Sequence, residues 1–504
     1  MNFVPPELER ILRQTPELQR AWLVGGCVRD GLLGCPGKDF DVEVFGLGCE
    51  ELAQGLSRWG KVDLVGQSFG VVKLKTGSEH SYDFTIPRRD SKIAAGHKGF
   101  AVELDPGITP AQAAARRDFT INSLMFDPRT GELLDFFGGA ADLRAGILRH
   151  TSPAFVEDPL RVLRGMQLAG RFNLKPAGET VELCRRIKGG FSELAGQRVR
   201  DEWFKWAEKS AAPSSGLKFL AATGWVEHFP EIQALLGTPQ DPEWHPEGDV
   251  FVHTGHCCDA MARLPEWRSA GPEARMVYML AILAHDFGKP ATTQAAMKDG
   301  RSRIISPGHD ALGGELAQRF LERIHAPPAI QARVVPLVVN HIIHFQTLSD
   351  RALRRLAKRL EPENIRGLCL VITADSMGRP PLAPAQPENV RQLLARAREL
   401  EIQEKPPEPI LMGRHLLELG LAPGKDLGVI LDRAYEAQLE GQFFDLTHAL
   451  AWLREQGDLP LTADARSKLE ARCRREGQGS GSSAVPEESN PDGPHHEGKT
   501  RSKT

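Results

Sequence analysis

Two aspartates, Asp39 and Asp41, stand two residues apart in GKDFDVEVFG, a segment that otherwise has the pattern of a buried β-strand. Side chains alternate between the two faces of a strand, so Asp39, Asp41 and Glu43 are expected on one face and the apolar residues on the other. Carboxylates this close repel one another unless a cation lies between them. Mg²⁺ prefers carboxylate oxygens and commonly bridges them to substrate phosphates. For this spacing alone, an edge strand whose acids face water is the alternative, because short motifs recur freely.

Two further segments fit the same chemistry. The alternating segment SYDFTIPRR supplies Asp83 as the candidate third carboxylate. Upstream, LVGGCVRDGLLG places Gly25 and Gly26 between an expected strand and an expected helix, where backbone N–H groups can meet a phosphate. Arg29 can add a bidentate phosphate contact, and Asp30 can orient it. A glycine turn that serves only for packing is the alternative.

The combination of these segments is more informative than either alone. A glycine turn followed about ten residues later by an acidic strand is what a nucleotidyltransferase of the polymerase β type requires. The turn would hold a nucleoside triphosphate, and the carboxylates would hold two metal ions. One metal would activate the attacking hydroxyl, and the other would stabilise the leaving pyrophosphate.

A second group of residues has the order H…HD…H…H…D. Its members are His253, His285, Asp286, His309, His341 and Asp375. Neutral imidazoles and carboxylates together bind transition metals such as Mn, Fe, Ni or Co. Each histidine alone is more often structural, and we assign that role to His256 and His344, but the ordered set favours a metal centre. Lys289, just after HDFG, is a candidate phosphate contact.

The bulk composition indicates a water-soluble chain. Its 504 residues predict two to four domains. No run of about 18 apolar residues predicts a membrane span, and the first residues show no secretory signal. Cys257 and Cys258 are adjacent, which is poor geometry for a disulfide, so we expect free thiols and a cytoplasmic location. The net charge of −3 argues mildly against a nucleic-acid binder, although it does not exclude local basic patches.

Short β-like runs and helices alternate over about residues 21–145, and the pattern is almost wholly helical from about 146. Proline-rich stretches at 378–389 and 404–410 predict linkers or tight loops. A basic helical face is formed by Arg351, Arg354, Arg355 and Lys358, for which a solvated surface is an equally good interpretation. The polar C-terminal segment is expected to be disordered.

The N-terminal motifs closely resemble those of the class II tRNA nucleotidyltransferase and bacterial poly(A) polymerase family, which contains the CCA-adding enzymes. The resemblance covers about residues 21–206 in family order. The matching segments are GGCVRDGLLGCPGKDFDVEVFG, RRDFTINSL (116–124), DPRTGELLDFFGGAADLRAGILR (127–149), EDPLRVLRGMQLAGRF (157–172) and, less strongly, GQRVRDEWFKW.

The resemblance implies that Asp39 and Asp41 hold two Mg²⁺ ions. It also implies that Arg117, Asp118 and Asn122 lie near the ribose, where polar groups can test for a 2′-hydroxyl.

The same resemblance implies that EDPLR reads the incoming base. Asp158 and Arg161 are three residues apart and are expected on one helix face. The carboxylate can accept from the amino group of C or A, and the guanidinium can donate to a ring nitrogen or carbonyl. Arg164 extends this face. A helix that carries only internal salt bridges is the alternative.

The histidine region resembles the HD-domain metal-dependent phosphohydrolases, with the six residues named above as a dinuclear ligand set. A subset of bacterial CCA-adding enzymes carries such a domain. A metal that only stabilises the domain is the alternative. The segment 411–428 resembles the family tail, which would contact tRNA largely through phosphates.

We therefore predict an α+β nucleotidyltransferase head with a polymerase β-like mixed sheet, followed by an all-α neck, HD domain and tail. The predicted boundaries are 1–146 for the head, 147–212 for the neck, 213–390 for the HD-containing body, 391–472 for the tail and 473–504 for a disordered end.

The predicted function is addition or repair of the 3′-CCA of tRNA from CTP and ATP, with a phosphohydrolase activity. The alternatives are A-adding, CC-adding or poly(A)-adding activity, an HD phosphohydrolase with an RNA-binding head, and a non-catalytic RNA scaffold. Partners would be tRNA, CTP and ATP without a membrane, and both a monomer and a homodimer remain open.

Overall fold

The computed structural model describes residues 3–35, 37–65, 70–92, 100–298, 300–346 and 348–479. The chain divides into two compact units. The first comprises Met1–Thr347 with Leu356–Lys405, and the second comprises Leu348–Arg355 with Pro406–Thr504. The predicted linker at 404–410 contains the point, between Lys405 and Pro406, where the chain passes from the first unit to the second. The predicted start of the tail at 391 lies before this point. The boundaries predicted within the first unit stay predictions.

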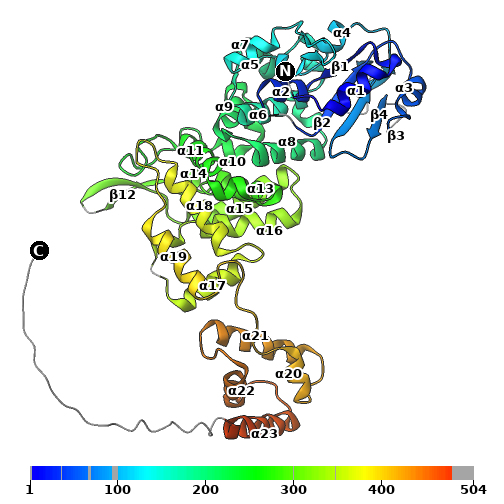
Figure 1. The fold of residues 1–504 in the computed structure, drawn as a ribbon. Coiled ribbons are helices and arrows are strands. Elements are labelled where there is room, and N and C mark those ends of the chain that lie inside the picture. Colours follow the sequence, from blue (N-terminus) through cyan, green and yellow to red (C-terminus); the bar gives the residue numbers. More distant parts are fainter. Residues whose placement is uncertain are drawn as a thin grey trace, which may run out of the picture. The chain divides into compact units, whose positions relative to one another are not determined.

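A seven-stranded mixed sheet forms the head of the first unit (Figure 1). The strand order is β3-β4-β5-β2-β1-β8-β9, and β2 pairs with β5 in parallel while its pairing with β1 is antiparallel. The strands are β1 (Ala21–Val24), β2 (Asp39–Val44), β3 (Lys61–Val65), β4 (Val71–Lys75), β5 (Ser81–Thr85), β8 (Met125–Asp127) and β9 (Glu132–Leu134). This arrangement confirms the predicted mixed sheet.

The apolar face of β2 builds the core of the head. Phe40, Val42 and Val44 are almost fully buried in one cluster with residues from three helices, as the alternation predicts. These helices are α1 (Pro6–Gln14), α2 (Gly26–Leu32) and α3 (Cys49–Leu56). Since these helices cover one face of β2, the acidic residues on the opposite face remain available for a site.

Smaller elements complete the head. They are the hairpin β6 (Arg88–Lys92) and β7 (Phe100–Leu104), helix α4 (Pro110–Ala115), the 3-10 helix η2 (Thr120–Asn122) and helix α5 (Gly139–Ala145). The segment INSLMFD (121–127), one of the β-like runs within 21–145, is part 3-10 helix and part β8.

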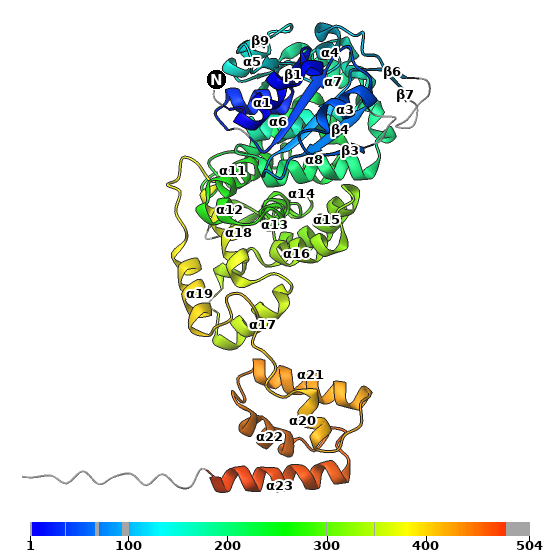
Figure 2. The ribbon, with the colours of Figure 1, turned by 45° about the vertical axis from the view of Figure 1, so that its right-hand side comes forward.

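A mainly helical neck follows, formed by α6 (Leu160–Phe172), α7 (Gly178–Arg186), α8 (Gly196–Lys209) and α9 (Pro213–Thr223). The prediction of an all-α neck was wrong at its start, where β10 (Ile147–Leu148) pairs in parallel with β11 (Lys175–Pro176). Helices α6 and α9 pack against each other at Gly165, where the absence of a side chain lets the ring of Phe219 approach. Figures 1 and 2 both show α8 between the head and helix α13, and α8 packs against α13. Trp203 and Trp206 of α8 are fully buried: Trp203 packs against Phe320, and Trp206 lies beside Gly170 of α6 and Gly216 of α9.

The histidine-rich region is mainly helical. Its principal helices are α11 (Val250–Arg263), α13 (Pro272–Ala284), α14 (Lys289–Thr292), α15 (His309–Arg323), α16 (Pro328–Asn340), α18 (Ile365–Met377) and α19 (Glu388–Glu399). The prediction of a wholly helical body was wrong at one place, where β12 (Gln294–Lys298) and β13 (Arg301–Ile305) form a hairpin. Gly300 in its turn has a φ of 73°, a conformation that glycine adopts without strain. The Asp-Gly pair in the sequence is a hairpin signal that the helical interpretation overlooked.

The second unit has its own apolar core, which includes Leu416, Ile430 and Leu450. Its helices are α20 (Gly413–Glu418), α21 (Lys425–Leu439), α22 (Leu446–Glu455) and α23 (Ala463–Gly479). Helix α23 continues past residue 473, where disorder was expected to begin, and residues 480–504 lie outside the described residues.

The basic helical face at the start of α17 (Asp350–Leu360) is largely neutralised within the second unit. Arg351 and Arg355 both pair with Glu440, and Arg354 lies 5.2 Å from the ring centroid of Phe444. These contacts favour the interpretation of a surface salt-bridge network over a bare cationic patch.

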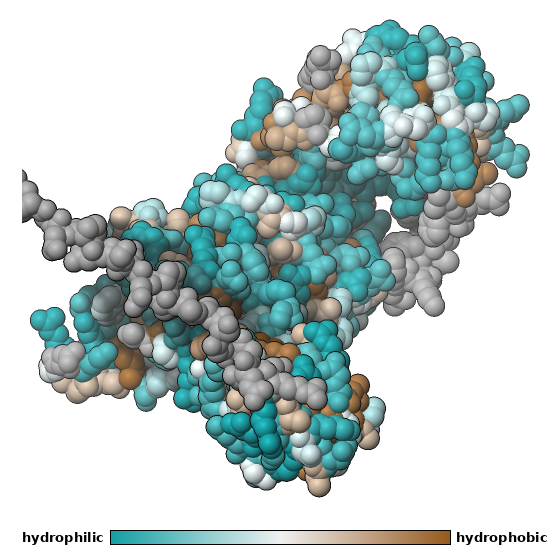
Figure 3. All heavy atoms as spheres, turned by 60° about the horizontal axis from the view of Figure 1, so that its bottom comes forward, coloured by the Kyte–Doolittle hydropathy of each residue, from teal (hydrophilic) through white to brown (hydrophobic). Residues whose placement is uncertain are grey.

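None of the described helices is long and apolar enough to cross a bilayer. On the face seen in Figure 3, hydrophilic residues cover most of the surface and apolar residues lie in small groups.

We expect Gly165→Val to destabilise the neck by about 1–3 kcal/mol, because a β-carbon at this position would lie 2.6 Å from Cζ of Phe219. Thermal denaturation followed by circular dichroism measures this effect. Gly178→Ala, where a β-carbon meets nothing within 4 Å, is the matched control and should change stability little. Equal melting temperatures for the two variants would contradict the close packing of α6 on α9.

Candidate active sites

Three carboxylates meet on the open face of the head sheet. The parallel register places Asp41 directly opposite Asp83, and Asp39 opposite Ser81. Adjacent strands lie about 4.8 Å apart, so the acids at these positions are close neighbours. Asp83 contacts Lys73 through Oδ2 at 3.0 Å, whereas its Oδ1 is buried and has no hydrogen-bond partner among the described residues.

The pKa of Asp41 is raised, and electrostatic repulsion contributes to this shift. This carboxylate faces a cavity, but the surrounding protein withdraws bulk water and raises its pKa, and Asp83 and Asp39 raise it further. Arg117 opposes the shift. A divalent cation would relieve this repulsion and satisfy Oδ1 of Asp83, so these residues fit a Mg²⁺ site.

Glu43, the third acid on this face of β2, has a different partner. It is 8% exposed, and its Oε2 lies 3.2 Å from Nη2 of Arg117. This ion pair withdraws Glu43 from the carboxylate cluster. The alternation of the strand predicted its face, but the partner comes from a segment 74 residues away.

The glycine turn between β1 and α2 closes one side of the cavity. Gly25 has a φ of 73°, and a β-carbon here would lie 2.8 Å from Nη1 of Arg117. The positive φ therefore favours glycine, whereas the terminal nitrogen of Arg117 could move away from a β-carbon. The cavity measures about 520 Å³. Its lining includes ten of the twelve head and neck residues predicted from the sequence: Gly25, Gly26, Arg29, Asp41, Arg117, Asp118, Asn122, Asp158, Arg161 and Arg164.

Arg29 has further partners besides Asp30, which was expected to orient it. It is 4% exposed, its Nε donates to Oδ1 of Asp30 at 2.8 Å, and its Nη1 donates to Oδ1 of Asn122 at 2.5 Å. Its guanidinium also lies 4.4 Å from the ring centroid of Phe172. Arg29 therefore joins the turn, η2 and α6, and only part of it faces the cavity.

Asp118 is the centre of a second network. Nε of Arg164 donates to its Oδ2 at 2.7 Å, and Nδ2 of Asn122 donates to its Oδ1 at 2.9 Å. Burial alone would raise the pKa of Asp118, but Arg164 and these hydrogen bonds lower it to about 2. The carboxylate is thus ionised and fixed. It orients Arg164 and Asn122 toward the cavity.

Asp158 and Arg161 both line the cavity, but they are not neighbours on one helix face as expected. Asp158 precedes α6 in extended backbone, accepts from the Leu160 N–H at 3.1 Å, and pairs with Arg198 at 2.7 Å. Pro159 follows it, and a residue before proline is pushed out of helical conformation. Arg161 donates instead to the carbonyl oxygens of Ala154 and Arg116, at 2.9 and 2.8 Å.

These partners exclude the alternative of a helix with only internal salt bridges. Asp158 pairs with Arg198 of α8, and Arg164 pairs with Asp118, so both side chains have partners outside residues 157–164.

The sequence analysis did not predict several residues that line the cavity: Gln167, Arg171, Arg198, Lys205 and Lys209. The last three lie on one face of α8, at spacings of seven and four residues, and that helical period was a usable signal. The lining now contains eight basic and three acidic side chains. A chain with a net charge of −3 thus concentrates positive charge where a triphosphate would bind.

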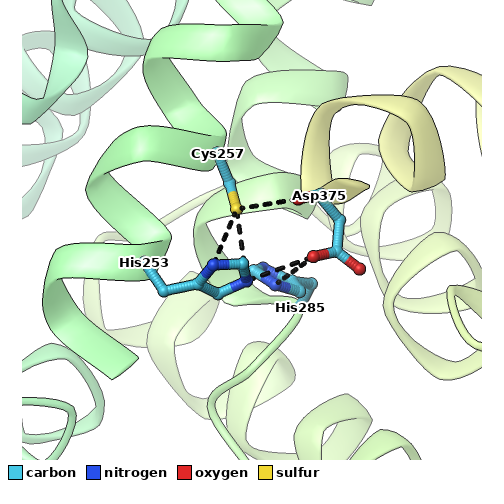
Figure 4. A group of neighbouring side chains, drawn as sticks. All are labelled: His253, Cys257, His285 and Asp375. Atoms are coloured by element: carbon cyan, nitrogen blue, oxygen red, sulfur yellow. Dashed lines mark hydrogen bonds and ion pairs between the residues drawn. The ribbon is translucent and has the colours of Figure 1, made fainter. Parts of the chain in front are cut away.

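The predicted histidines and aspartates converge in the second site. Nε2 of His253 lies 3.1 Å from Oδ1 of Asp375, and Nε2 of His285 lies 3.8 Å from the same oxygen (Figure 4). They come from three helical segments, since His253 is on α11, His285 follows α13 and Asp375 is on α18.

Asp286 connects this group to a second one. Its Oδ2 lies 3.1 Å from Nε2 of His285, and its Oδ1 lies 3.6 Å from Nε2 of His309. Asp286, His309 and His341 form their own cluster of candidate ligands. One carboxylate therefore faces both halves of the site, as a ligand that bridges two metals must.

The ring nitrogens are oriented for metal binding. Nδ1 of His285, His309 and His341 each donates to a backbone carbonyl oxygen at 2.7 Å, which leaves Nε2 as the lone-pair nitrogen. Nε2 of His285 is buried without a hydrogen-bond partner among the described residues. Nε2 of His309 and Nε2 of His341 face each other at 3.3 Å, where two lone pairs repel unless a cation is shared.

Burial together with His285 and His309 lowers the pKa of His341 to about 3, so its imidazole is neutral, as metal ligation requires. The residue types and their orientation fit a transition-metal centre.

Residues outside the predicted set complete the second site. Glu247 accepts from Nδ1 of His253 at 2.7 Å and from Nδ1 of His245 at 2.9 Å. Glu247 lies in a loop before α11, so no periodic pattern pointed to it. Lys289 contacts Oδ2 of Asp286 at 2.7 Å and lines the adjoining cavity of about 570 Å³.

Of the two histidines interpreted as structural, His344 also lines this cavity, but its Nδ1 is engaged by the carbonyl oxygen of His341. Neither His256 nor His344 belongs to a ligand cluster among the described residues.

Sequence comparison identifies the family. The family model described as "Poly A polymerase head domain" matches residues 21–149. The "Multifunctional CCA protein" of Xanthomonas campestris pv. campestris (strain B100) is 36% identical over 374 residues, which is 71% of this chain and 85% of that protein. The chain belongs to the CCA-adding enzyme family. The protein of the same name from Neisseria meningitidis serogroup C is 35% identical over 372 residues, 71% of this chain and 83% of that protein.

Solved structures of CCA-adding enzymes share the fold. The structure titled "Thermotoga maritima CCA-adding enzyme complexed with tRNA_CCA" covers 90% of this chain and 97% of its own, at 20% identity and a TM-score of 0.54. The Bacillus stearothermophilus CCA-adding enzyme in complex with CTP covers 94% of this chain and 100% of its own, at 19% identity and a TM-score of 0.58.

The Asp118 network predicts a pH dependence of stability. The pKa of Asp118 in the folded enzyme, about 2, lies below the ordinary value of about 3.9. Its pairing therefore contributes roughly 2 kcal/mol above pH 4, and this contribution is lost as the pH falls toward 2. Urea unfolding at pH 7 and pH 3 should show a larger loss of stability for the natural enzyme than for Asp118→Asn.

Asp201→Asn, which alters a half-exposed acid on α8, is the control and should keep the pH dependence of the natural enzyme. The same pH dependence in the natural enzyme and in Asp118→Asn would contradict the assigned ion pair.

Proposed function

We propose that this CCA-adding enzyme adds or repairs the 3′-terminal CCA of tRNA, using CTP and ATP and no nucleic-acid template. One observation carries the proposal. The glycine turn, Asp41 of the acidic strand and the EDPLR residues Asp158 and Arg161 all line one strongly basic cavity, with Asp39 and Asp83 next to Asp41 outside the lining. A triphosphate, a reacting 3′-end and a base can therefore be held at a single site.

The acidic end of the cavity is assigned to the chemical step. Asp39 and Asp41 would hold two Mg²⁺ ions, with Asp83 as a third carboxylate beside Asp41. When bound, the two ions would activate the attacking 3′-hydroxyl of tRNA and stabilise the leaving pyrophosphate. The cationic lining from Arg117 and α8 would hold the phosphates, and the Gly25–Gly26 turn lets the backbone approach them.

Base choice is assigned to Asp158 and Arg161. Arg198 and the Leu160 N–H fix the Asp158 carboxylate, and two carbonyl oxygens fix the Arg161 guanidinium. Cytosine and adenine both offer an amino group to the carboxylate and an adjacent ring acceptor to the guanidinium. Uracil and guanine have a carbonyl oxygen and a ring N–H at the corresponding positions. Arg117, Asp118 and Asn122 are assigned to the ribose side, with Asp118 orienting Asn122.

The second site is assigned to a metal-dependent phosphohydrolase. The ligands would be His253, His285, Asp286, His309, His341 and Asp375, arranged as two halves that share Asp286. We propose Mn, Ni, Co or Fe as the metal, because imidazole-rich sites suit these ions. Lys289 beside Asp286 would contact the phosphate of the substrate.

We assign tRNA as the macromolecular partner, in the cytoplasm where tRNA is processed. The relatives' structures support this assignment, since one is a complex with tRNA and another a complex with CTP. The helical second unit is assigned to contacts with tRNA phosphates.

Extension of defined tRNA tests the main proposal. Transcripts ending before CCA, and transcripts ending in CC, are incubated with labelled CTP or ATP and Mg²⁺ and resolved to single nucleotides. We expect two C additions followed by one A. Only C, only A or a long A ladder would replace the proposal with the corresponding sister activity.

Asp41→Asn should lower nucleotide addition at least about 1,000-fold, because removal of one metal ligand costs several kcal/mol of transition-state stabilisation. Asp63→Asn, on the outer strand β3 of the same sheet, is the matched control and should extend tRNA normally. An Asp41→Asn enzyme that keeps its rate would remove the acidic strand from the mechanism.

Arg161→Met should blur nucleotide choice more than it weakens binding of tRNA. A good bidentate base contact is worth about 1–3 kcal/mol, so discrimination of CTP against UTP should fall roughly 5- to 150-fold. Single-turnover rates with each nucleotide measure this ratio, and Arg185→Met on the neck surface is the control. Unchanged selectivity would refute the assignment of Arg161.

Asp286→Asn should abolish metal-dependent hydrolysis of p-nitrophenyl phosphate and leave nucleotide addition intact, because the two sites have separate lining residues. Asp310→Asn, in the first turn of α15, is the control. Loss of both activities in Asp286→Asn, with the fold unchanged by circular dichroism, would contradict the two-site assignment.

A further inference from the structure

A cysteine lies within the histidine–aspartate centre. Cys257 follows His253 by one turn of α11, and its Sγ lies 3.3 Å from Nε2 of His253 and 3.7 Å from the backbone oxygen of Asp375 (Figure 4). The side chain is completely buried. Its polar neighbours are residues of the metal centre, which is unusual for a cysteine that only fills a core.

The four donor atoms have metal-site spacing. One atom each from His253, Cys257, His285 and Asp375 lies within 4.8 Å of the other three. In a tetrahedral zinc site with metal–sulfur bonds of about 2.3 Å and metal–nitrogen bonds of about 2.0–2.1 Å, neighbouring donors are about 3.4–3.6 Å apart. The separation of 3.1 Å between Nε2 of His253 and Oδ1 of Asp375 is close to these values. Sγ of Cys257 lies 3.3 Å from Nε2 and 3.7 Å from Nδ1 of His253, over the face of the ring, so a metal on Nε2 reaches the sulfur only after one of the two side chains rotates.

An independent observation points to a cation among these four residues. His285 is 1% exposed, and its Nδ1 donates to the carbonyl oxygen of Ile282. Its Nε2 is therefore a buried lone pair, and it has no hydrogen-bond partner among the described residues. Leaving such a nitrogen unpaired is costly unless a ligand satisfies it.

We propose that Cys257 is a sulfur ligand of the half-site formed with His253, His285 and Asp375. The inference rests on the proposed metal-dependent function of this centre. Sulfur ligands favour Zn²⁺, Co²⁺ and Fe²⁺ over Mg²⁺, so Cys257 makes this half-site selective for thiophilic metals. On binding, the thiol proton is released to solvent and a sulfur–metal bond forms.

The other half-site is chemically different. Asp286, His309 and His341 supply only oxygen and nitrogen donors and line the open cavity. The centre would thus hold a tightly bound, sulfur-ligated metal in its inner half and a more exchangeable metal where the substrate enters.

Cobalt substitution tests the proposal on the full-length enzyme. The apoenzyme is titrated with Co²⁺ alone, and its absorption spectrum is recorded. A thiolate ligand gives a sulfur-to-cobalt charge-transfer band in the near ultraviolet, apart from the visible d–d bands of any bound Co²⁺. We expect this band in the natural enzyme, with loss of the band and at least tenfold weaker binding of Zn²⁺ in Cys257→Ser.

Cys258→Ser is the matched control. Cys258 is the next residue, is equally buried, and belongs to no ligand cluster among the described residues. This variant should keep the charge-transfer band and the Zn²⁺ affinity. CCA addition by each variant reports on folding, because the nucleotide cavity contains neither cysteine. If Cys257→Ser lacks CCA addition, Cys257→Ala is measured in its place.

The outcomes distinguish the role of Cys257 from the presence of a metal centre. Visible d–d bands without a charge-transfer band in the natural enzyme would overturn the role of Cys257 and leave the metal centre standing. No Co²⁺ binding at all would overturn the metal-dependent function itself. Equal spectra for the natural enzyme and a folded Cys257→Ser variant would also overturn the sulfur ligand.

Discussion

The parallel pairing of β2 with β5 is the constraint on which the nucleotide site depends. It sets Asp41 opposite Asp83 and packs the other face of β2 into the apolar core. Like charges are thereby held together by the free energy of core burial, which exceeds their mutual repulsion. Burial raises the pKa of Asp41, Asp83 and Asp39 raise it further, and Oδ1 of Asp83 is buried without a hydrogen-bond partner among the described residues. A site under this strain gains stability when a cation binds, so the same packing that forms the sheet prepares the metal site.

Opposite charge balances this acidic end within the same cavity. Asp118 fixes Arg164, Arg198 fixes Asp158, and Asp30 fixes Arg29, so the cationic lining is positioned before any ligand arrives. A base and a triphosphate bound there would meet oriented groups rather than flexible side chains. Such preorganisation is what the proposed selection of C and A by protein groups alone would require.

Helix α8 gives the two sites a common support. One face carries Arg198, Lys205 and Lys209 into the nucleotide cavity. The other face buries Trp203, whose ring lies 5.2 Å from that of Phe320 on α15, and α8 also packs on α13, the helix that ends at His285. The histidine–aspartate cluster therefore rests on the same packed layer as the basic residues of the cavity.

The sequence by itself determined the local features whose signals are short-range. Strand alternation placed the acids of β2 on one face and its apolar residues on the other, and the glycine turn followed from two adjacent glycines before a helix. The ordered histidines and aspartates indicated the metal centre, because their residue types carry the chemistry wherever the chain brings them.

Only the tertiary structure decided which of these residues are partners. Glu43 pairs with Arg117, Asp158 pairs with Arg198 rather than Arg161, and Cys257 lies beside His253 and Asp375. Such pairs join elements far apart in the chain, or depend on a proline that ends helical geometry before α6. Periodicity within one segment contains no information about the distance to another segment, and that distance is set by how the helices and the sheet pack.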